Sequence, residues 1–337
     1  MGAAITGWGA ALPERVMTND ELGSALNISA DWIHERTGIH TRRVAGEGET
    51  TASLATEAAA TALRVAGIHP RTVDTVIVAT STPDYQLPAT ASLVQHRLGC
   101  TNAGAFDIGA ACTGFLYALA QAEALVQSDA CDVVLVIGAD TLSRITDYDD
   151  AKSCVLFGDG AGAVVVQKSA SARIGPFRFH SDGAYVDALY VDPTERLIRM
   201  QGREVYRHAV EAMSDVLEEL LSATGWAPSD VDLVVAHQAN GRILEAVAAR
   251  LGVDRSKMAM HIGKVGNTSA ASIPLALIDA LDNDRLNDGD VVALTAFGAG
   301  FTWGAGLLHW GAPLEREPSH PRIPALVGTA GHLLEVL

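Results

Sequence analysis

Cysteine is scarce in this sequence. Only four cysteines occur, at positions 100, 112, 131 and 154, and none forms a CxxC pair or a zinc-finger spacing. The spacing therefore argues against a small disulfide scaffold and gives no reason to expect a metal or another bound cofactor. In an acidic chain without a signal peptide, such cysteines are typical of reduced thiols, so we expect a cytoplasmic protein.

Basic residues and long apolar runs are also few. The chain has 24 Lys and Arg against 40 Asp and Glu, and the net charge of −16 would repel nucleic acid and anionic membranes. The apolar stretch at 3–12 is short and is interrupted by Gly7, Trp8 and Gly9, so it predicts neither a signal peptide nor a membrane span. An acidic partner would need a local basic patch.

What the sequence does contain is a repeated pattern. PRTVDTVIVAT at 70–80 resembles PSDVDLVVAHQ at 228–238, and CDVVLVIGAD at 131–140 resembles GDVVALTAFG at 289–298. Asp74 and Asp232 lie 158 positions apart, as do Asp132 and Asp290, and one shared offset indicates a duplication. GDGAGAVVV after Phe157 and WGAGLLHW after Thr302 repeat at a shorter offset, as an insertion or deletion would produce.

Each half alternates helical stretches with Val- and Ile-rich runs that lack a period of two. Such runs are typical of strands covered on both faces. With 48% apolar residues, the chain can bury a large core, and we expect two α/β halves related by a pseudo-twofold axis. The predicted division is 1–170 for the first half, 171–311 for the second and 312–337 for a C-terminal extension with no assignable role.

Cys112 follows a predicted strand and a knot of small residues, and it precedes an apolar helix. A cysteine at a helix start lies in the positive field of the helix dipole, which favours the thiolate. By itself the motif favours a buried structural cysteine, and this is how we interpret Cys100, Cys131 and Cys154.

Two further polar residues stand at comparable places in the second half. His237 ends a predicted strand where the first half has only Ala79, although a histidine after an apolar strand often belongs to the core. Asn267 lies in a small-residue turn that the 158-residue offset places close to the Cys112 turn. Helix capping would also explain this asparagine. A glycine-rich bend at 297–304 fits a simple hairpin or a backbone N–H for an oxyanion hole.

Six segments together resemble the β-ketoacyl-acyl carrier protein synthase III family. They are DWIHERTGI at 31–39, AACTGF at 110–115, FGDGAGA at 157–163, AHQANGRI at 236–243, GNTSAAS at 266–272 and FGAGFTWG at 297–304. The resemblance implies a thiolase fold, with five αβαβα layers built from two duplicated α/β halves. It also implies an acyltransferase that initiates fatty acid or type II polyketide chains.

The family's catalytic Cys, His and Asn match Cys112, His237 and Asn267. The resemblance implies that Cys112 takes an acyl group from a thioester, acyl-CoA by default, and that malonyl-ACP then loses carbon dioxide and attacks the acyl-Cys. The side chains of His237 and Asn267 would stabilise the negative charge of decarboxylation, and the backbone N–H groups of Cys112 and Ala299 would stabilise that of condensation. Coenzyme A would be a substrate and not a resident cofactor.

The resemblance also assigns binding residues and partners. It places Trp32, Arg36, Asn240 and Lys152 along the acyl-CoA and pantetheine path, and it implies docking of the acyl carrier protein on Arg203, Arg207, Arg242 and Arg250. The acyl pocket would be lined by Leu142, Leu156, Phe157 and Leu189, together with Leu87 from the partner subunit of a homodimer.

Three positions depart from the family pattern. Ala151 and Lys152 stand where relatives commonly have an Arg-Gly pair that stacks on adenine, and the acidic run at 147–150 is unfavourable for nucleotide phosphates. The sequence therefore allows an acyl donor carried either on coenzyme A or on a carrier protein, and it does not specify the starter acyl group. Ala299 replaces a usual glycine, which matters only if the backbone there needs a positive φ.

Two other functions remain as alternatives. One is an acyltransferase of the same fold that moves an acyl group from Cys112 to an alcohol or amine, and the retained Asn267 argues against it. The other is a catalytically silent partner subunit, which the intact set of three residues disfavours.

Overall fold

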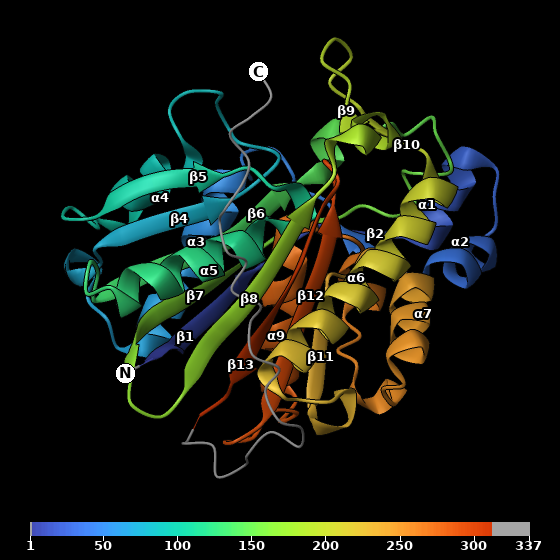
Figure 1. Cartoon of the computed structure of the whole chain (residues 1–337). Helices are drawn as coiled ribbons and strands as arrows, with labels where there is room; N and C mark the ends of the chain where they lie inside the picture. Colours follow the sequence, from blue (N-terminus) through green and yellow to red (C-terminus); the bar gives the residue numbers. More distant parts are fainter. Residues whose placement is uncertain (1, 312–337) are drawn as a thin grey trace, which may run out of the picture.

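Residues 2–311 are described in the computed structural model of the chain. They form two stacked β-sheets with helices between them and on both outer faces (Figure 1). Three clusters of buried apolar side chains fill the spaces between the layers. The predicted five-layered α/β architecture is confirmed.

The first sheet consists of strands that are buried on both faces. In β6 (Val133–Thr141), Leu135 and Ile137 pack toward the outer helices, whereas Val134 and Val136 face the inner layer. This two-sided burial accounts for the apolar runs without alternation. The strand order is β1-β7-β6-β4-β5, completed by β1 (Gly2–Ala11), β7 (Asp159–Ser169), β4 (Thr75–Ala79) and β5 (Gly104–Ile108).

The second sheet repeats the plan of the first. Its order is β11-β12-β13-β8, with β11 (Leu233–Ala236), β12 (Val291–Gly298), β13 (Thr302–His309) and β8 (Arg173–Ser181). β11 and β12 are parallel, as β4 and β6 are, and the pairs β12-β13 and β13-β8 are antiparallel, as β6-β7 and β7-β1 are. The first sheet has in addition the parallel pair of β4 and β5. The predicted duplication is therefore visible in the strand pairing. The counterpart of β5 is reduced to an isolated bridge between Val234 and Met258.

Helices occupy three layers. Of the outer helices, α3 and α4 pack on the first sheet and α6 packs on the second with α7 beside it, whereas α5 and α9 lie between the two sheets (Figure 1). α3 begins with a capping box between Thr50 and Ser53, and α3 and α6 end at the equivalent glycines Gly67 and Gly225, both with positive φ. The bounds are α3 (Thr51–Ala66), α4 (Thr90–Leu98), α5 (Gly114–Gln127), α6 (Gly202–Thr224), α7 (Gly241–Leu251) and α9 (Ser272–Asp282).

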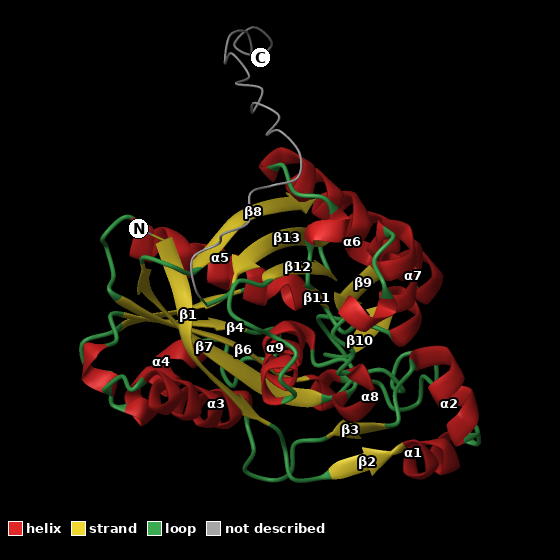
Figure 2. Ribbon diagram, turned by 90° about the horizontal axis from the view of Figure 1, so that it is seen from below, coloured by secondary structure: helices red, strands yellow, loops and turns green. Residues whose placement is uncertain are grey.

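Smaller elements gather at one end of the layers (Figure 2). They are β2 (Val16–Thr18), α1 (Asn19–Leu26), α2 (Ala30–Thr37), β3 (Thr41–Arg43), β9 (Leu189–Val191), β10 (Ile198–Met200) and α8 (Ile262–Val265). Single turns of 3₁₀ helix precede or join the main elements, at η1 (Pro70–Thr72), η2 (Ala111–Thr113), η3 (Leu142–Ile145), η4 (Gly183–Ala188), η5 (Pro228–Asp230), η6 (Arg255–Lys257) and η7 (Ser269–Ala271).

The boundary predicted between 170 and 171 stays a prediction, although the first sheet uses residues up to Ser169 and the second begins at Arg173. The predicted extension at 312–337 lies outside the described residues. Between residues 2 and 311, no helix is long and apolar enough to cross a membrane.

Candidate active site

A pocket of about 1250 Å³ lies between the two halves, and its lining includes most of the residues singled out from the sequence. Those that line it are Trp32, Arg36, Cys112, Leu142, Lys152, Leu156, Phe157, Leu189, Arg203, His237, Asn240, Arg242, Asn267 and Ala299. Three do not line it: Leu87, Arg207 and Arg250. The pocket thus joins candidate catalytic and binding residues from both halves of the chain.

Cys112 stands in the middle of η2, immediately before α5. Ala111 adopts φ 46°, a strained conformation for a residue with a side chain, and the turn packs against the end of β12. A Cβ on Gly298 would lie 2.8 Å from the Cys112 nitrogen, so only glycine permits this approach. The end of β12 therefore lies directly against the nucleophile turn.

The electrostatic surroundings of Cys112 differ from the expectation. The pKa of the thiol is raised to about 12, mainly by burial and to a smaller extent by the nearby Asp140 carboxylate, while a hydrogen bond with Ser269 acts in the opposite direction. The field of the helix start does not outweigh loss of water around the sulfur. At neutral pH Cys112 is therefore a thiol.

His237 follows β11 and is 1% exposed. Its backbone N–H donates to the Thr295 carbonyl at 2.8 Å, which ties the end of β11 to β12. The neighbouring Gln238 side chain donates to the carbonyls of Ala236 and Ala259 and accepts the N–H groups of His261 and Ile262. Burial lowers the pKa of His237 to about 3, so the imidazole is neutral at physiological pH.

Asn267 is held by the opposite half of the protein. Its N–H donates to the Leu156 carbonyl at 2.8 Å, and its carbonyl accepts the Gly158 N–H at 2.9 Å. The side-chain Oδ1 accepts the Ser269 N–H at 2.9 Å, which is a local turn and not the helix cap considered from the sequence, since Thr268 and Ala271 stand at the cap positions of η7 and α9. Because this bond occupies Oδ1, the Nδ2 group is left as the hydrogen-bond donor for a ligand in the pocket.

Two residues near the thiol were not singled out from the sequence. Ser269 contributes the hydrogen bond to Cys112 noted above. Asp140 is fully buried and accepts the N–H groups of Ser81, Thr82 and Ala270, which fixes the turn that carries Ser269. The 158-residue offset was the available signal for Ser269, since it places this residue opposite Ala111.

The backbone of Ala299 follows Gly298 and lines the pocket beside Cys112. Gly300 has φ 134°, whereas Ala299 is not among the residues with positive φ. The alanine in place of the usual glycine therefore causes no backbone strain.

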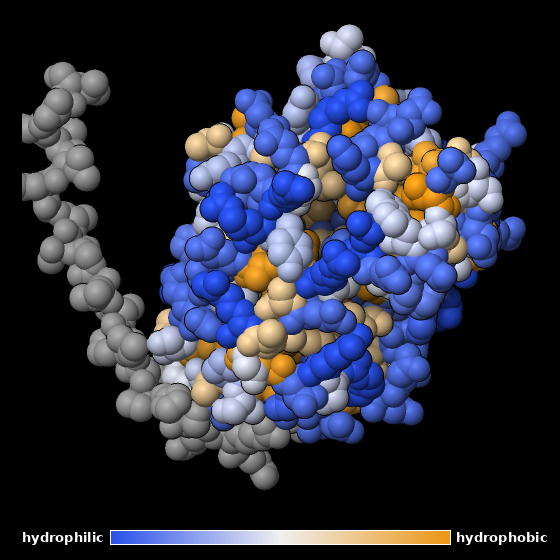
Figure 3. Space-filling model, turned by 90° about the vertical axis from the view of Figure 1, so that its right-hand side faces the viewer, coloured by the Kyte–Doolittle hydropathy of each residue, from blue (hydrophilic) through white to orange (hydrophobic). Residues whose placement is uncertain are grey.

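The mouth of the pocket combines aromatic and basic groups. The Arg36 guanidinium lies 4.3 Å from the centre of the Trp32 ring, a cation–π contact on α2. Lys152 also lines the pocket. The face that carries α2 and α7 is largely hydrophilic, with apolar atoms around a hollow (Figure 3).

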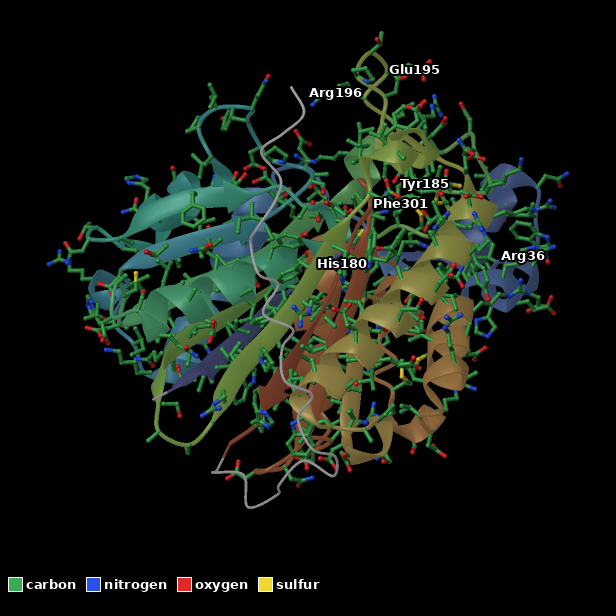
Figure 4. The ribbon with its side chains drawn as sticks, in the orientation of Figure 1. Arg36, His180, Tyr185, Glu195, Arg196 and Phe301 are labelled. Atoms are coloured by element: carbon green, nitrogen blue, oxygen red, sulfur yellow. The ribbon has the colours of Figure 1, made fainter. Side chains whose placement is uncertain are left out.

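The acidic run at 147–150 is mostly engaged within the protein. Asp147 pairs with Arg199 of β10, and Asp150 accepts hydrogen bonds from the Ser153 hydroxyl and the Lys152 N–H. These contacts reduce the expected repulsion of phosphates. The hairpin of β9 and β10 projects above the site, with Glu195 and Arg196 at its tip (Figure 4).

The four predicted docking arginines fall into two groups. Arg203 on α6 and Arg242 on α7 line the pocket mouth, and Arg242 Nε donates to the Glu35 carbonyl at 3.1 Å. In contrast, Arg207 pairs with Glu204 at 2.6 Å and Arg250 with Asp215 at 2.7 Å. All four are exposed, so all remain accessible to an acidic partner.

Asn240, predicted to lie along the pantetheine path, also makes two hydrogen bonds within the protein. Asn240 Nδ2 donates to the Arg36 carbonyl at 3.1 Å, and Oδ1 accepts the Arg242 N–H at 2.8 Å, which caps α7. These bonds connect the pocket wall to α2.

An aromatic wall closes the site on the side of α6. The ring centres of Phe297 and Phe301 lie 4.6 Å apart, and Phe301 stacks on Tyr185 with 5.3 Å between the ring centres. Behind this wall is a second cavity of about 390 Å³, whose lining also includes His180 and His208 (Figure 4). Phe297 lines both cavities and therefore separates them.

A thiol and two N–H donors at one end of a pocket, set between duplicated α/β halves, define a condensing enzyme of the thiolase fold. Comparisons with known proteins agree. Residues 106–183 match the family model of 3-oxoacyl-[acyl-carrier-protein (ACP)] synthase III, and residues 221–310 match its C-terminal model. The chain belongs to the 3-oxoacyl-ACP synthase III family, whose members are acyltransferases.

Individual relatives cover nearly the whole chain. A β-ketoacyl-ACP synthase III from Erythrobacter litoralis is 49% identical over 318 residues, 91% of this chain and 99% of the relative. The 3-oxoacyl-ACP synthase III structure from Aquifex aeolicus is 45% identical, with a TM-score of 0.90 over 92% of this chain and 100% of that one. The priming β-ketosynthase of the R1128 polyketide pathway is 34% identical, with a TM-score of 0.88 over 93% and 97%.

Proposed function

We propose that this enzyme joins an acyl group carried on Cys112 to the two-carbon unit of malonyl-ACP, with loss of carbon dioxide. The observation that carries the proposal is the convergence of the Cys112 thiol, His237 and Asn267 on one pocket, from turns of both halves. The product is a 3-ketoacyl-ACP, the first intermediate of a fatty acid or polyketide chain.

The first half-reaction is acyl transfer. Cys112 Sγ attacks the carbonyl of the incoming thioester, the bond to the donor sulfur breaks, and the thiol proton leaves with the released pantetheine thiol. The high pKa of Cys112 means that this proton is removed only as the new bond forms. Acylation also removes the charge that burial disfavours.

The second half-reaction begins with decarboxylation. Malonyl-ACP loses carbon dioxide, and the electron pair of the broken carbon–carbon bond becomes an enolate at the thioester. His237 and Asn267 Nδ2 donate to the oxygen on which this charge develops. Each such fixed donor contributes roughly 3 kcal/mol to the transition state.

Carbon–carbon bond formation follows. The enolate carbon attacks the acyl-Cys carbonyl, and the oxygen of the tetrahedral intermediate lies beside the turn of Cys112 and Ala299. Backbone N–H groups at this place need no reorganisation to stabilise the oxyanion. Collapse of the intermediate releases the Cys112 thiolate, which regains a proton.

We propose acyl-CoA as the default donor, with Trp32, Arg36 and Lys152 against its nucleotide and Asn240 beside the pantetheine. Because Ala151 offers no adenine stack, donor binding depends more on Lys152 and Arg36 than on stacking. No resident cofactor takes part in the proposed reaction. The exposed Arg203, Arg207, Arg242 and Arg250 are proposed to bind the acidic carrier protein, as their positions around the mouth and on α6 and α7 suggest.

A homodimer is proposed from the edge of the first sheet. β5 pairs only with β4 among the described strands, so its other edge is open. Phe106 on this strand is 39% exposed, and Leu87 nearby in the chain is 85% exposed. An open edge with apolar side chains is a pairing surface, and a second copy there could lend Leu87 to the acyl pocket.

We also propose a cytoplasmic location, supported by four free cysteines within the described residues. The alternative activity, transfer from Cys112 to an alcohol or amine, would not use the donor group of Asn267.

One assay separates these activities. The protein is incubated with acyl-CoA and malonyl-ACP, and carbon dioxide and 3-ketoacyl-ACP are followed, with Cys112→Ser as the control. Stoichiometric release of both products in the wild type, and no 3-ketoacyl-ACP in the control, is the expected result. Acyl transfer without carbon dioxide would overturn the proposal.

A further inference from the structure

Within residues 2–311, the buried His237 side chain hydrogen-bonds to one other side chain. Its Nδ1 lies 2.6 Å from the hydroxyl oxygen of Ser272, the first residue of α9, and both residues are 1% exposed. His237 also lines the pocket, and since Nδ1 is bonded to Ser272, Nε2 is the ring nitrogen left for a ligand. The bond to Ser272 therefore determines what His237 presents to a substrate.

Ser272 has a second bond whose direction is fixed. Its oxygen accepts the backbone N–H of Gln238 at 3.2 Å. A backbone N–H can only donate, so this bond uses one lone pair of the Ser272 hydroxyl. The hydroxyl proton itself still needs an acceptor. Among the described residues, His237 Nδ1 is the remaining hydrogen-bonding partner of this hydroxyl.

Two neutral forms of the imidazole can be compared. If Nδ1 carried the proton, it would donate to Ser272, and the buried hydroxyl proton would have no acceptor. If Nδ1 accepts from Ser272, the serine proton and the Gln238 N–H are both bonded, and Nε2 carries the hydrogen. An unmet buried donor is costly, so the second arrangement is favoured.

We propose that Ser272 is a positioning residue that holds His237 in the Nε2-protonated form, so that an N–H and not a lone pair faces the developing enolate oxygen. This inference rests on the proposed function only for its catalytic consequence. Burial keeps the imidazole neutral by lowering its pKa to about 3, which leaves the tautomer as the property to be set.

The duplication supports this assignment independently. Counting back 158 positions, Ala79 takes the place of His237 and Gly114 takes the place of Ser272. These two also lie together, because a Cβ on Gly114 would stand 3.1 Å from the Ala79 Cβ. The first half has neither the imidazole nor the hydroxyl at this contact, so the two polar groups occur together in one half and are both missing from the other.

The direct test is nuclear magnetic resonance of protein labelled with ¹⁵N at histidine. Two-bond ¹H–¹⁵N correlations distinguish the tautomers, and the His237 signals are assigned by their loss in His237→Gln. The wild type is expected to show protonated Nε2 and unprotonated Nδ1. A protonated Nδ1 in the wild type would overturn the proposal, whatever the activity of the enzyme.

Variants test the consequence for catalysis. Ser272→Ala should populate the other tautomer and slow malonyl-ACP decarboxylation roughly 10-fold, without slowing acylation of Cys112. Ser272→Thr, which keeps the hydroxyl, should recover most of the rate. Ser214→Ala is the matched control, because Ser214 on α6 is also buried and its hydroxyl has no partner.

The outcomes are distinct. A Ser272→Ala variant with an unchanged tautomer and unchanged decarboxylation would reject the role of Ser272. If the wild type has the expected tautomer but does not release carbon dioxide, the proposed function fails and the assignment of the tautomer stands. If Ser272→Ala does not fold, the tautomer seen in the wild-type spectrum and the decarboxylation rate of Ser272→Thr still test the role of Ser272.

Discussion

Ala111 and Ser269 lie 158 positions apart and share a left-handed backbone, with φ of 46° and 49°. Each begins a 3₁₀ turn that leads into one of the two central helices. The two turns meet in the middle of the molecule, so the strained residue of one half lies beside the reactive residue of the other. Strain of this kind persists only where the surrounding packing enforces it.

The thiol form of Cys112 leads to a test with an alkylating reagent. Since the pKa is raised to about 12, the thiolate fraction should grow roughly tenfold for each pH unit through the neutral range. The rate of iodoacetamide labelling, followed by mass spectrometry of the Cys112 peptide, should therefore rise without a plateau up to about pH 9. A plateau below about pH 8 would mean that the helix start stabilises the thiolate more than burial destabilises it.

The Asn267 side chain accepts one hydrogen bond within its turn and has Nδ2 as a donor, and substitution can separate the two. Asn267→Asp keeps an oxygen for the Ser269 N–H but removes the Nδ2 donor. We expect malonyl-ACP decarboxylation to fall about 100- to 1000-fold while acylation of Cys112 by acyl-CoA stays near its normal rate.

Asn267→Ala removes both functions and serves for comparison. Its decarboxylation rate should fall by the same factor, and its thermal stability should fall slightly, since the lost hydrogen bond to the Ser269 N–H contributes about 1 kcal/mol. Equal losses in the two half-reactions, in either variant, would contradict the proposed division between Cys112 and Asn267.

The neutral state of His237 has a consequence for the pH profile. An imidazole with a pKa of about 3 does not change its charge in the neutral range, whereas one with an ordinary pKa would. The decarboxylation rate at saturating malonyl-ACP should therefore be flat between about pH 5.5 and 8. An inflection near pH 6.5 that disappears in His237→Gln would show that the imidazole titrates during turnover.

The open edge of β5 leads to a prediction about assembly. Phe106→Asp places a charge on the proposed pairing surface and should convert the dimer to a monomer, as measured by analytical ultracentrifugation. Val65→Asp on α3 is the control, because Val65 is 47% exposed and lies away from this edge. A Phe106→Asp protein with unchanged mass would place the subunit interface elsewhere.

The sequence was most informative where the duplication and the motifs acted together. The shared offset predicted that the Cys112 and Asn267 turns would meet, because both belong to equivalent places in equivalent halves. Ion pairs between side chains that the repeat does not relate were not predictable. Arg199 removes much of the charge from the acidic run through Asp147, and Arg250 is paired with Asp215 across two helices.

The acidity of Cys112 was misjudged for a related reason. A helix start can be recognised locally, but burial depends on every segment that packs around the sulfur. Asp140, whose charge opposes the thiolate, reaches the site from the end of β6. Ser272 was likewise missed, since its significance appears only when β11 and α9 are seen side by side.

The neutral imidazole of His237 has one more consequence, which concerns the fate of the carbanion. A charged histidine would be a proton source close to the enolate, and a quenched enolate would leave the enzyme as unproductive acetyl-ACP. A neutral imidazole N–H is far too weakly acidic to surrender its proton, although it still donates a hydrogen bond. In the proposed reaction, burial of His237 would therefore protect the yield of each turnover, because the carbanion would survive long enough to meet the acyl group on Cys112.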